Sequence, residues 1–197
     1  MLDLGNRISN KYFPGIASLL GVAAIWSAVA GGAERGQLTP TEETSIGIYH
    51  IPDVAETRNL WQTGDPGERL LLRGRVVTSS GTPISDAQVE LWQADGSGQV
   101  HQDRYRTRLH SRPDGSFGVT TAMPGYIPGA PDIWGARHIH VVVTHADYAQ
   151  LISLILFKGD PNLVGLPYPK LAVFVEQGQI KDQTMQFAEV VLVLSAK

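Results

Sequence analysis

The chain has 197 residues, of which 43% are hydrophobic and 18% charged, and its net charge is −3. This length and composition suit one globular domain with an adequate core, with or without a targeting segment. The slight acidity, without a basic cluster, gives no electrostatic footprint for nucleic acid. Because the chain has no cysteine, disulfides, thiolate metal sites and cysteine nucleophiles are excluded, and any metal must be held by His, Tyr, Asp or Glu.

The first 30 residues have the features of an export signal. Arg7 and Lys11 give a positive start, no charged side chain occurs from Tyr12 to Ala33, and Ala28-Val29-Ala30 is a small-x-small cleavage pattern. We predict a secretory signal peptide over 1–30. The uncharged run is also just long enough for an uncleaved membrane anchor. Both interpretations place the folded part outside the cytoplasm, in the periplasm or the extracellular space.

Residues 31–69 show neither helical nor strand periodicity, and Gly, Pro and Asp cluster in them. A free linker would be polar, but this segment also carries apolar side chains, namely Ile46, Ile48, Tyr49, Leu60 and Trp61. We therefore predict an extended N-terminal arm that lies over the domain.

From Leu70 onward the chain has the pattern of short strands separated by Gly, Pro and Asp turns. No window has the periodicity of an amphipathic helix, and Asp114-Gly115 indicates a hairpin turn. We predict an all-β fold, an antiparallel β-sandwich over 70–197. The expected strands are Leu70–Thr78, Ala87–Ala94, Ser116–Thr121, His138–Thr144, Leu151–Phe157 and Phe187–Leu194.

Two histidines lie two residues apart at the start of one predicted strand. Because side chains alternate along a strand, His138 and His140 share a face while Ile139 points the other way. This arrangement would direct two imidazole nitrogens at one metal ion. A half-buried strand that happens to carry two histidines is the alternative, and the motif alone does not separate them. The remaining histidines are predicted to lie in solvated turns or strand ends, except for His101, which is considered below; they are His50, His110 and His145.

Several segments together have a recognisable family pattern. The most specific are Ala87-Gln-Val-Glu-Leu-Trp-Gln-Ala-Asp and His138-Ile-His, supported by Pro113–Phe117, Pro124–Pro128 and Phe157–Pro161. The set resembles the intradiol ring-cleavage dioxygenases, the non-haem iron(III) enzymes of the catechol and protocatechuate type. The match runs from residue 39 to residue 165. The family fold is a β-sandwich, in agreement with the strand pattern.

The resemblance implies a metal centre in which two tyrosinates and two histidines hold Fe(III). Phenolate oxygens are hard anionic donors that favour Fe(III), and imidazoles complete the set. Matched by motif, the histidines are His138 and His140, and the tyrosine of the Pro-Gly-Tyr-Ile-Pro loop is Tyr126. In the family this tyrosine leaves the metal when substrate binds. The implied substrate is a small aromatic diol that chelates the iron before O2 attacks its ring.

Three positions depart from the family pattern, and each loses a polar group. The second tyrosine position is Val100, the arginine three residues before the first histidine is Gly135, and the glutamine before the Phe-x-Gly-Asp motif is Leu154. Valine cannot bind a metal. Arg137, beside His138, would supply positive charge from another direction and is our candidate catalytic residue. Together the departures suggest changed or lost chemistry.

Two residues near Val100 are candidates for the missing ligand. Tyr105 lies five residues on, in a predicted loop that would have to reach back, and the alternative is an aromatic without a metal role. His101 adjoins Val100 and would give a three-histidine site with Tyr126. Having fewer anionic ligands, such a site would tolerate a divalent ion better than a two-tyrosinate site does.

Two functions follow from the sequence. The first is an exported non-haem iron enzyme of the intradiol type that opens a catecholic ring between its two hydroxylated carbons. The second is a non-catalytic secreted β-sandwich derived from that fold, which binds a metal or an aromatic ligand. Relatives in the family often dimerise, so the resemblance also allows a homodimer in which the arm at 39–69 embraces a second subunit.

Overall fold

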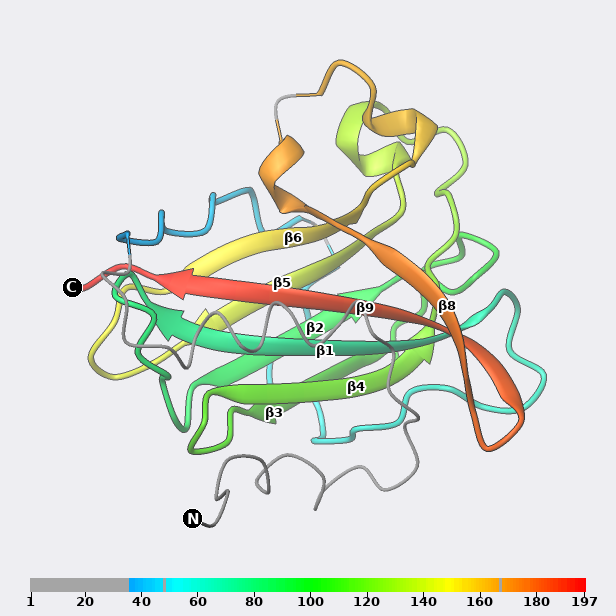
Figure 1. Cartoon of the computed structure of the whole chain (residues 1–197). Helices are drawn as coiled ribbons and strands as arrows, with labels where there is room; N and C mark the ends of the chain where they lie inside the picture. Colours follow the sequence, from blue (N-terminus) through cyan, green and yellow to red (C-terminus); the bar gives the residue numbers. More distant parts are fainter. Residues whose placement is uncertain (1–35, 48, 167) are drawn as a thin grey trace, which may run out of the picture.

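The computed structural model describes residues 36–47, 49–166 and 168–197. They form two β-sheets packed face to face (Figure 1), in the strand orders β4-β1-β9-β8 and β3-β2-β5-β6-β7. The all-β sandwich is therefore confirmed. The elements are β1 (Arg69–Thr78), β2 (Gln88–Gln93), β3 (Arg106–His110), β4 (Ser116–Ala122), η1 (Asp132–Gly135), β5 (His138–Thr144), β6 (Leu151–Phe157), η2 (Pro161–Leu163), η3 (Pro169–Leu171), β7 (Ala172–Val173), β8 (Val175–Ile180) and β9 (Gln183–Leu194).

The predicted signal peptide or anchor at 1–30 lies outside the described residues. Within the described ranges, the helical segments are the short 3-10 turns η1, η2 and η3. None of the helices there has the length and apolar character needed to cross a membrane.

The sheets are mixed. Of the seven strand pairs, β1–β9 and β6–β7 are parallel and the other five are antiparallel. The alternation of apolar residues shows which face of a strand is buried but carries no information on the direction of its neighbour. The sequence pattern therefore predicted the sandwich but could not predict that these two strand pairs are parallel.

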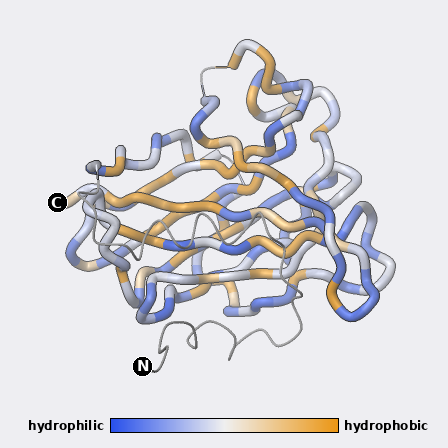
Figure 2. The backbone as a smooth tube through the Cα atoms, in the orientation of Figure 1, coloured by the Kyte–Doolittle hydropathy of each residue, from blue (hydrophilic) through white to orange (hydrophobic). Residues whose placement is uncertain are grey.

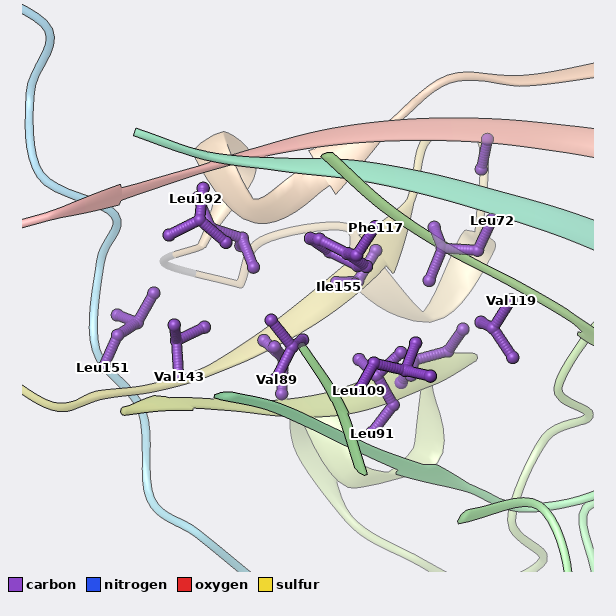
Figure 3. Packing of buried hydrophobic residues seen from close by; sticks show 14 of the residues in the cluster. Leu72, Val89, Leu91, Leu109, Phe117, Val119, Val143, Leu151, Ile155 and Leu192 are labelled. Carbon is purple, nitrogen blue, oxygen red and sulfur yellow. The ribbon is translucent and has the colours of Figure 1, made fainter. Parts of the chain in front are cut away.

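The core lies between the sheets, where alternate side chains of both inner faces meet (Figure 3). Leu72, Phe117 and Leu192 from the four-stranded sheet pack towards Val89 and Ile155 from the other. Burying one such side chain stabilises the fold by about 1.5–3 kcal/mol. Apolar segments accordingly follow the strands, while polar segments lie in the connections (Figure 2).

One glycine makes the packing of Phe117 possible. A Cβ placed on Gly74 of β1 would lie 1.9 Å from Phe117 Cζ on the paired strand β4. The aromatic ring thus occupies the space that a side chain at position 74 would fill, and Gly74→Ala would displace the Phe117 ring from its place in the core.

The sequence pattern missed three edge strands: β7 because it has only two residues, and β3 and β8 because both are largely polar. Strand β3 reads Arg-Thr-Arg-Leu-His, and β8 reads Val-Glu-Gln-Gly-Gln-Ile. The hairpin from β8 to β9 turns at Lys181 and Asp182, whose φ angles are 47° and 63°. Two positive φ angles are typical of a type I′ turn, but Lys-Asp is not its usual Asn-Gly signature. The predicted hairpin at Asp114-Gly115 is wrong, because this turn joins β3 to β4, which lie in different sheets.

The described part of the arm, residues 36–47 and 49–68, runs across the outside of the sandwich, and the one isolated bridge found in these ranges joins Asn59 to Thr120. It starts against β9 and β6, crosses the outer face of the five-stranded sheet, and ends beside β3 and β4. Its hydrogen bonds to the sheets include Thr41–Val193, Thr44–Ile152, Thr57–Thr107 and Leu60–Thr120. The predicted site lies beneath this crossing.

Candidate metal centre

His138 and His140 lie side by side on the outer face of the five-stranded sheet. Both are buried, with 5% and 6% of their surface exposed. Their ring centroids are 4.9 Å apart and the ring planes meet at 75°. The same-face arrangement expected from strand alternation is therefore present, with the two rings in contact.

The protonation of His138 is fixed by the backbone. Its Nδ1 lies 2.7 Å from the carbonyl oxygen of Ala136. A carbonyl only accepts hydrogen bonds, so Nδ1 carries the proton and Nε2 keeps its lone pair. Burial lowers the pKa of His138, which favours the neutral ring. This tautomer, with its other nitrogen held by a carbonyl, is the one that metal-binding histidines adopt.

His140 has no such anchor. Its Nδ1 is buried without a hydrogen-bond partner, and no hydrogen bond from the described part of the chain reaches its ring. Burial, and then the nearby His138 and His50, lower the pKa of His140 to about 3. Two neutral imidazoles, one with a buried nitrogen that lacks a partner, fit the needs of a metal ion.

Two indole rings pack on His140. Trp92, its cross-strand partner on β2, lies 4.6 Å away at an angle of 5° between ring planes. Trp134, from η1, lies 5.7 Å away at 16° and also meets His138 edge-on. Stacked pairs of this kind contribute about 0.5–1.5 kcal/mol each, so the indoles limit the movement of the imidazole.

Val100 lies on the same side of the sheet as the histidines. It forms an antiparallel bridge with Ala94, and Gln93 is paired with Ile139. One step further along this register, Ala94 comes opposite His138. Val100, Ala94 and His138 therefore occupy one row across the sheet, with side chains on one face. The register agrees with a former ligand position at residue 100.

The Tyr126 loop packs on the turn that precedes Val100. Gly125 N donates to Asp95 O at 2.8 Å. A Cβ on Gly98, where φ is +87°, would lie 1.8 Å from the Tyr126 carbonyl oxygen. This close approach, which only glycine allows, brings the Tyr126 loop to the end of β2, beside the row that contains Val100.

Tyr126 lies against Arg137, the candidate catalytic residue. The guanidinium carbon is 5.3 Å from the Tyr126 ring centroid. Arg137 is held in turn by Asp160, whose fully buried carboxylate accepts from the Arg137 backbone N at 2.8 Å and lies 3.4 Å from its Nε. Tyr126 is 41% exposed, and with Arg137, Gly96 and other residues it lines a cavity of about 350 Å³.

The other two candidate ligands have partners elsewhere. Tyr105 is fully buried, and its ring contacts are with His101 and Arg104. Burial and the nearby Asp65 carboxylate raise the pKa of Tyr105 to about 12, which favours the neutral phenol over the tyrosinate a metal needs. His101 Nε2 lies 2.8 Å from Asp95 Oδ2. These surroundings favour structural roles for Tyr105 and His101.

His50, which the sequence placed in a solvated turn, is part of the layer around the histidines, and that prediction is wrong. Its Nε2 lies 2.8 Å from Glu90 Oε2, and its ring lies 4.9 Å from that of Trp92. Because side chains alternate along a strand, Glu90 and Trp92 share one face of β2. No periodic signal connects the irregular arm to that face, so His50 could not be found from the pattern.

Across the part of the chain that the structure describes, no three His, Asp or Glu side chains are arranged to hold a metal ion. The arrangement consists of two buried histidines, a tyrosine loop beside them and an arginine behind the tyrosine.

Comparison with known proteins identifies the class. A family model described as Dioxygenase matches residues 50–190, and the chain belongs to that family, the intradiol ring-cleavage dioxygenases. The β chain of protocatechuate 3,4-dioxygenase from Burkholderia cepacia is 32% identical over 124 residues, which are 54% of this chain and 52% of the relative. Hydroxyquinol 1,2-dioxygenase from a Rhizobium species is 25% identical over 171 residues, 75% of this chain and 57% of the relative.

Solved structures agree on the fold. The dioxygenase domain of a dioxygenase–carbohydrate-binding protein fusion from Streptomyces sp. SirexAA-E superposes with a TM-score of 0.71 at 26% identity, covering 81% of this chain and 100% of that domain. 3-Chlorocatechol 1,2-dioxygenase from Rhodococcus opacus 1CP has a TM-score of 0.71 at 19% identity, covering 88% and 78%. The chain spans about half the length of the curated relatives it matches.

Proposed function

We propose that this protein binds Fe(III) through His138, His140 and Tyr126 and opens the ring of a small catecholic diol between its hydroxylated carbons. The observation that carries the proposal is the histidine pair, two buried and neutral imidazoles in contact, one with its metal-binding tautomer set by Ala136. Membership of the intradiol dioxygenase family supports it.

The bound ferric ion would supply Lewis acidity, drawing electron density from a chelated catechol so that O2 can attack the ring. His138 and His140 act as neutral donors that keep their positions during the reaction. Tyr126, whose side chain is partly exposed, would hold the ion through its phenolate oxygen, and the same oxygen would take up a proton from the incoming diol. Arg137, held behind Tyr126 by Asp160, provides positive charge next to that phenolate. Trp134 and Leu154 exclude water from the histidines.

A non-catalytic binding function is the second candidate, and the departures favour it. Val100 removes a tyrosinate from the row that contains His138, and Leu154 places a buried apolar side chain directly opposite His140. A site altered in this way would still hold an ion or an aromatic diol through the two histidines and Tyr126, without activating the ring.

One experiment separates the two candidates. The purified protein is loaded with Fe(III), and its iron content, visible spectrum and O2 uptake are measured with a panel of catechols. The enzyme requires stoichiometric iron, and the binding function requires a bound ion or diol; either should be lost in His138→Ala and His140→Ala, but not in His110→Ala, a matched control on an exposed strand end. Ring cleavage would establish the enzymatic function, and bound iron without turnover would favour the binding function. A wild-type protein that takes up no iron would refute the enzyme, and one that binds neither a metal ion nor a catechol would refute both.

We also propose that the protein is exported and that its mature form begins after Ala30. The charge distribution of residues 1–30 and the Ala28-Val29-Ala30 pattern support this. N-terminal sequencing of the secreted or periplasmic protein tests it. A chain that retains Met1 and fractionates with membranes would favour the anchor instead.

A further inference from the structure

The arm touches the candidate metal centre at Gly47. Its φ is +74°, and a Cβ placed there would lie 2.9 Å from His140 Cε1, 3.6 Å from Nδ1 and 3.7 Å from Nε2. Real Cβ atoms do not approach other atoms as closely as 2.9 Å. The backbone of the arm therefore packs against the corner of the imidazole between its two nitrogens, in a space and a conformation that only glycine fits.

The arm makes a second contact three residues later. His50 packs on Trp92, which stacks on His140, and Glu90 holds His50 at 2.8 Å. His50 and Glu90 are largely shielded, with 25% and 13% of their side chains exposed. Between the two contacts, Arg106 Nη1 donates to the Tyr49 carbonyl at 3.1 Å and ties the arm to the sheet. His50, Trp92 and His140 thus form one continuous layer.

The two histidines of the pair are held in different ways. The backbone carbonyl of Ala136 orients His138, as is usual for a metal-binding histidine. His140 has no hydrogen bond from the described residues that would do the same. Its orientation must therefore come from packing, and the groups packed on it include His138, Trp92, Trp134 and the Gly47 backbone.

We propose that Gly47 and His50 are positioning residues of the metal centre, through which the N-terminal arm fixes the His140 ring in place of the missing hydrogen bond. The inference rests on the proposed function, because it takes His140 as a metal ligand. It extends the site to the arm, which is outside the motif that carries the two histidines. The arm is then part of the metal centre and not only a cover for the sheet.

Gly47→Ala tests the first contact. Alanine at 47 would push the imidazole from its place, and loss of outer support of this kind typically costs about 10–100-fold in metal affinity. The matched control is Gly165→Ala. Gly165 has a similar φ of +80° with nothing within 4 Å of an added Cβ, so it carries the same backbone strain without the contact.

His50 variants test the second contact. His50→Ala removes the ring from Trp92 and the partner from Glu90, and we expect a loss of about tenfold in iron affinity. His50→Phe keeps a ring over Trp92 and should recover most of that loss. Glu90→Gln keeps a hydrogen-bond acceptor for His50 and should stay close to the wild type.

Two readouts distinguish positioning from general stability. In metal-free protein, long-range proton–nitrogen NMR of the imidazoles reports the environment of His140. The His140 signals should shift in Gly47→Ala and His50→Ala and should keep their wild-type positions in Gly165→Ala. In iron-loaded protein, the ferric EPR signal should change shape in the same two variants. Melting temperatures show whether the controls are equally destabilised.

The outcomes separate this inference from the proposed function. If wild-type protein binds iron but Gly47→Ala and His50→Ala match Gly165→Ala in affinity, NMR and EPR, the arm has no positioning role and the inference fails alone. If wild-type protein binds no iron, the proposed function fails. The inference is then overturned as well, whatever the NMR signals show, because His140 has no metal to bind.

Discussion

Leu154 is the direct cross-strand neighbour of His140, and both side chains are buried on the outer face of the five-stranded sheet. Leu154 packs there in a cluster with Ile133, Leu156 and Leu171. The family pattern has a glutamine at this position. His140 therefore has hydrocarbon beside it where an amide is expected.

Replacing Leu154 by the glutamine of the family pattern should lower the free energy of unfolding. In Leu154→Gln a polar group would enter the cluster that surrounds Leu154, and a buried amide without a partner costs about 1–3 kcal/mol. Urea unfolding near neutral pH measures this. Ile152→Gln, one step along the same face but only half-buried, should lose less. A Leu154→Gln protein as stable as the wild type would mean that the amide finds a partner beside His140.

The histidine pair should make stability depend on pH. Burial lowers the pKa of both residues, that of His140 to about 3. An unfolded histidine titrates near pH 6.5. Below that value the unfolded chain binds protons that the folded chain does not, so this stability is complete above about pH 6.5 and is lost as the pH falls towards 3. Urea unfolding of metal-free protein should show a slope of up to about 1.4 kcal/mol per pH unit for each histidine.

Two variants check the origin of that slope. His140→Asn removes one of the titrating groups and should reduce the dependence between about pH 6.5 and pH 4. His110→Gln, at an exposed strand end, should leave it unchanged. An unaltered slope in His140→Asn would show that carboxylates, and not the buried histidine, cause the acid sensitivity.

Val100→Tyr should strengthen the iron site. The row Val100, Ala94, His138 places residue 100 on the face of the histidines, and a tyrosine there would add a hard anionic oxygen that favours Fe(III). We expect tighter iron retention and a stronger phenolate-to-iron absorption band. Val100→Phe supplies the ring without the oxygen and should give neither effect. Equal spectra for the two variants would show that the side chain at 100 points away from the metal.

Gly135→Arg should not restore the family arginine. Gly135 is buried in η1, and a Cβ there would lie 2.6 Å from the Ala130 carbonyl oxygen. The backbone would have to move, and overpacking of this kind typically costs about 1–3 kcal/mol. Because the first side-chain atom already collides, Gly135→Ala should lose as much stability in urea unfolding as Gly135→Arg. A stable Gly135→Arg protein with higher activity would contradict this.

The features that could be predicted from the sequence are those that depend on residues close together along the chain. Alternating apolar residues located the buried strands, and the two-residue spacing of His138 and His140 put both rings on one face. Alternation in the predicted strand Ala87–Ala94 also puts Trp92 on the face opposite the buried Leu91. These properties depend only on neighbours along one strand.

The features that escaped depend on contacts between distant segments. His50 and Glu90 are 40 residues apart, and the irregular arm has no periodicity that would bring them together. Tyr105 and Tyr126 were both reasonable ligands in the sequence, and only the fold buries one beside Asp65 and leaves the other exposed beside Arg137. Strands β3 and β8 were missed because these edge strands are mostly polar, with too few apolar residues to show an alternation.

The position of β9 has a consequence for how the chain folds. Strand β9, the most C-terminal of the described strands, lies inside its sheet, between β1 and β8, and pairs with β1 in parallel from Leu70–Gln186 to Thr78–Leu194. Such long-range pairing closes slowly, because the entropy of a large loop is lost before the contacts form. A nascent or truncated chain without these residues would expose an unpaired edge of β1, which favours aggregation. The sandwich therefore cannot close until synthesis has reached the C-terminal end of the domain.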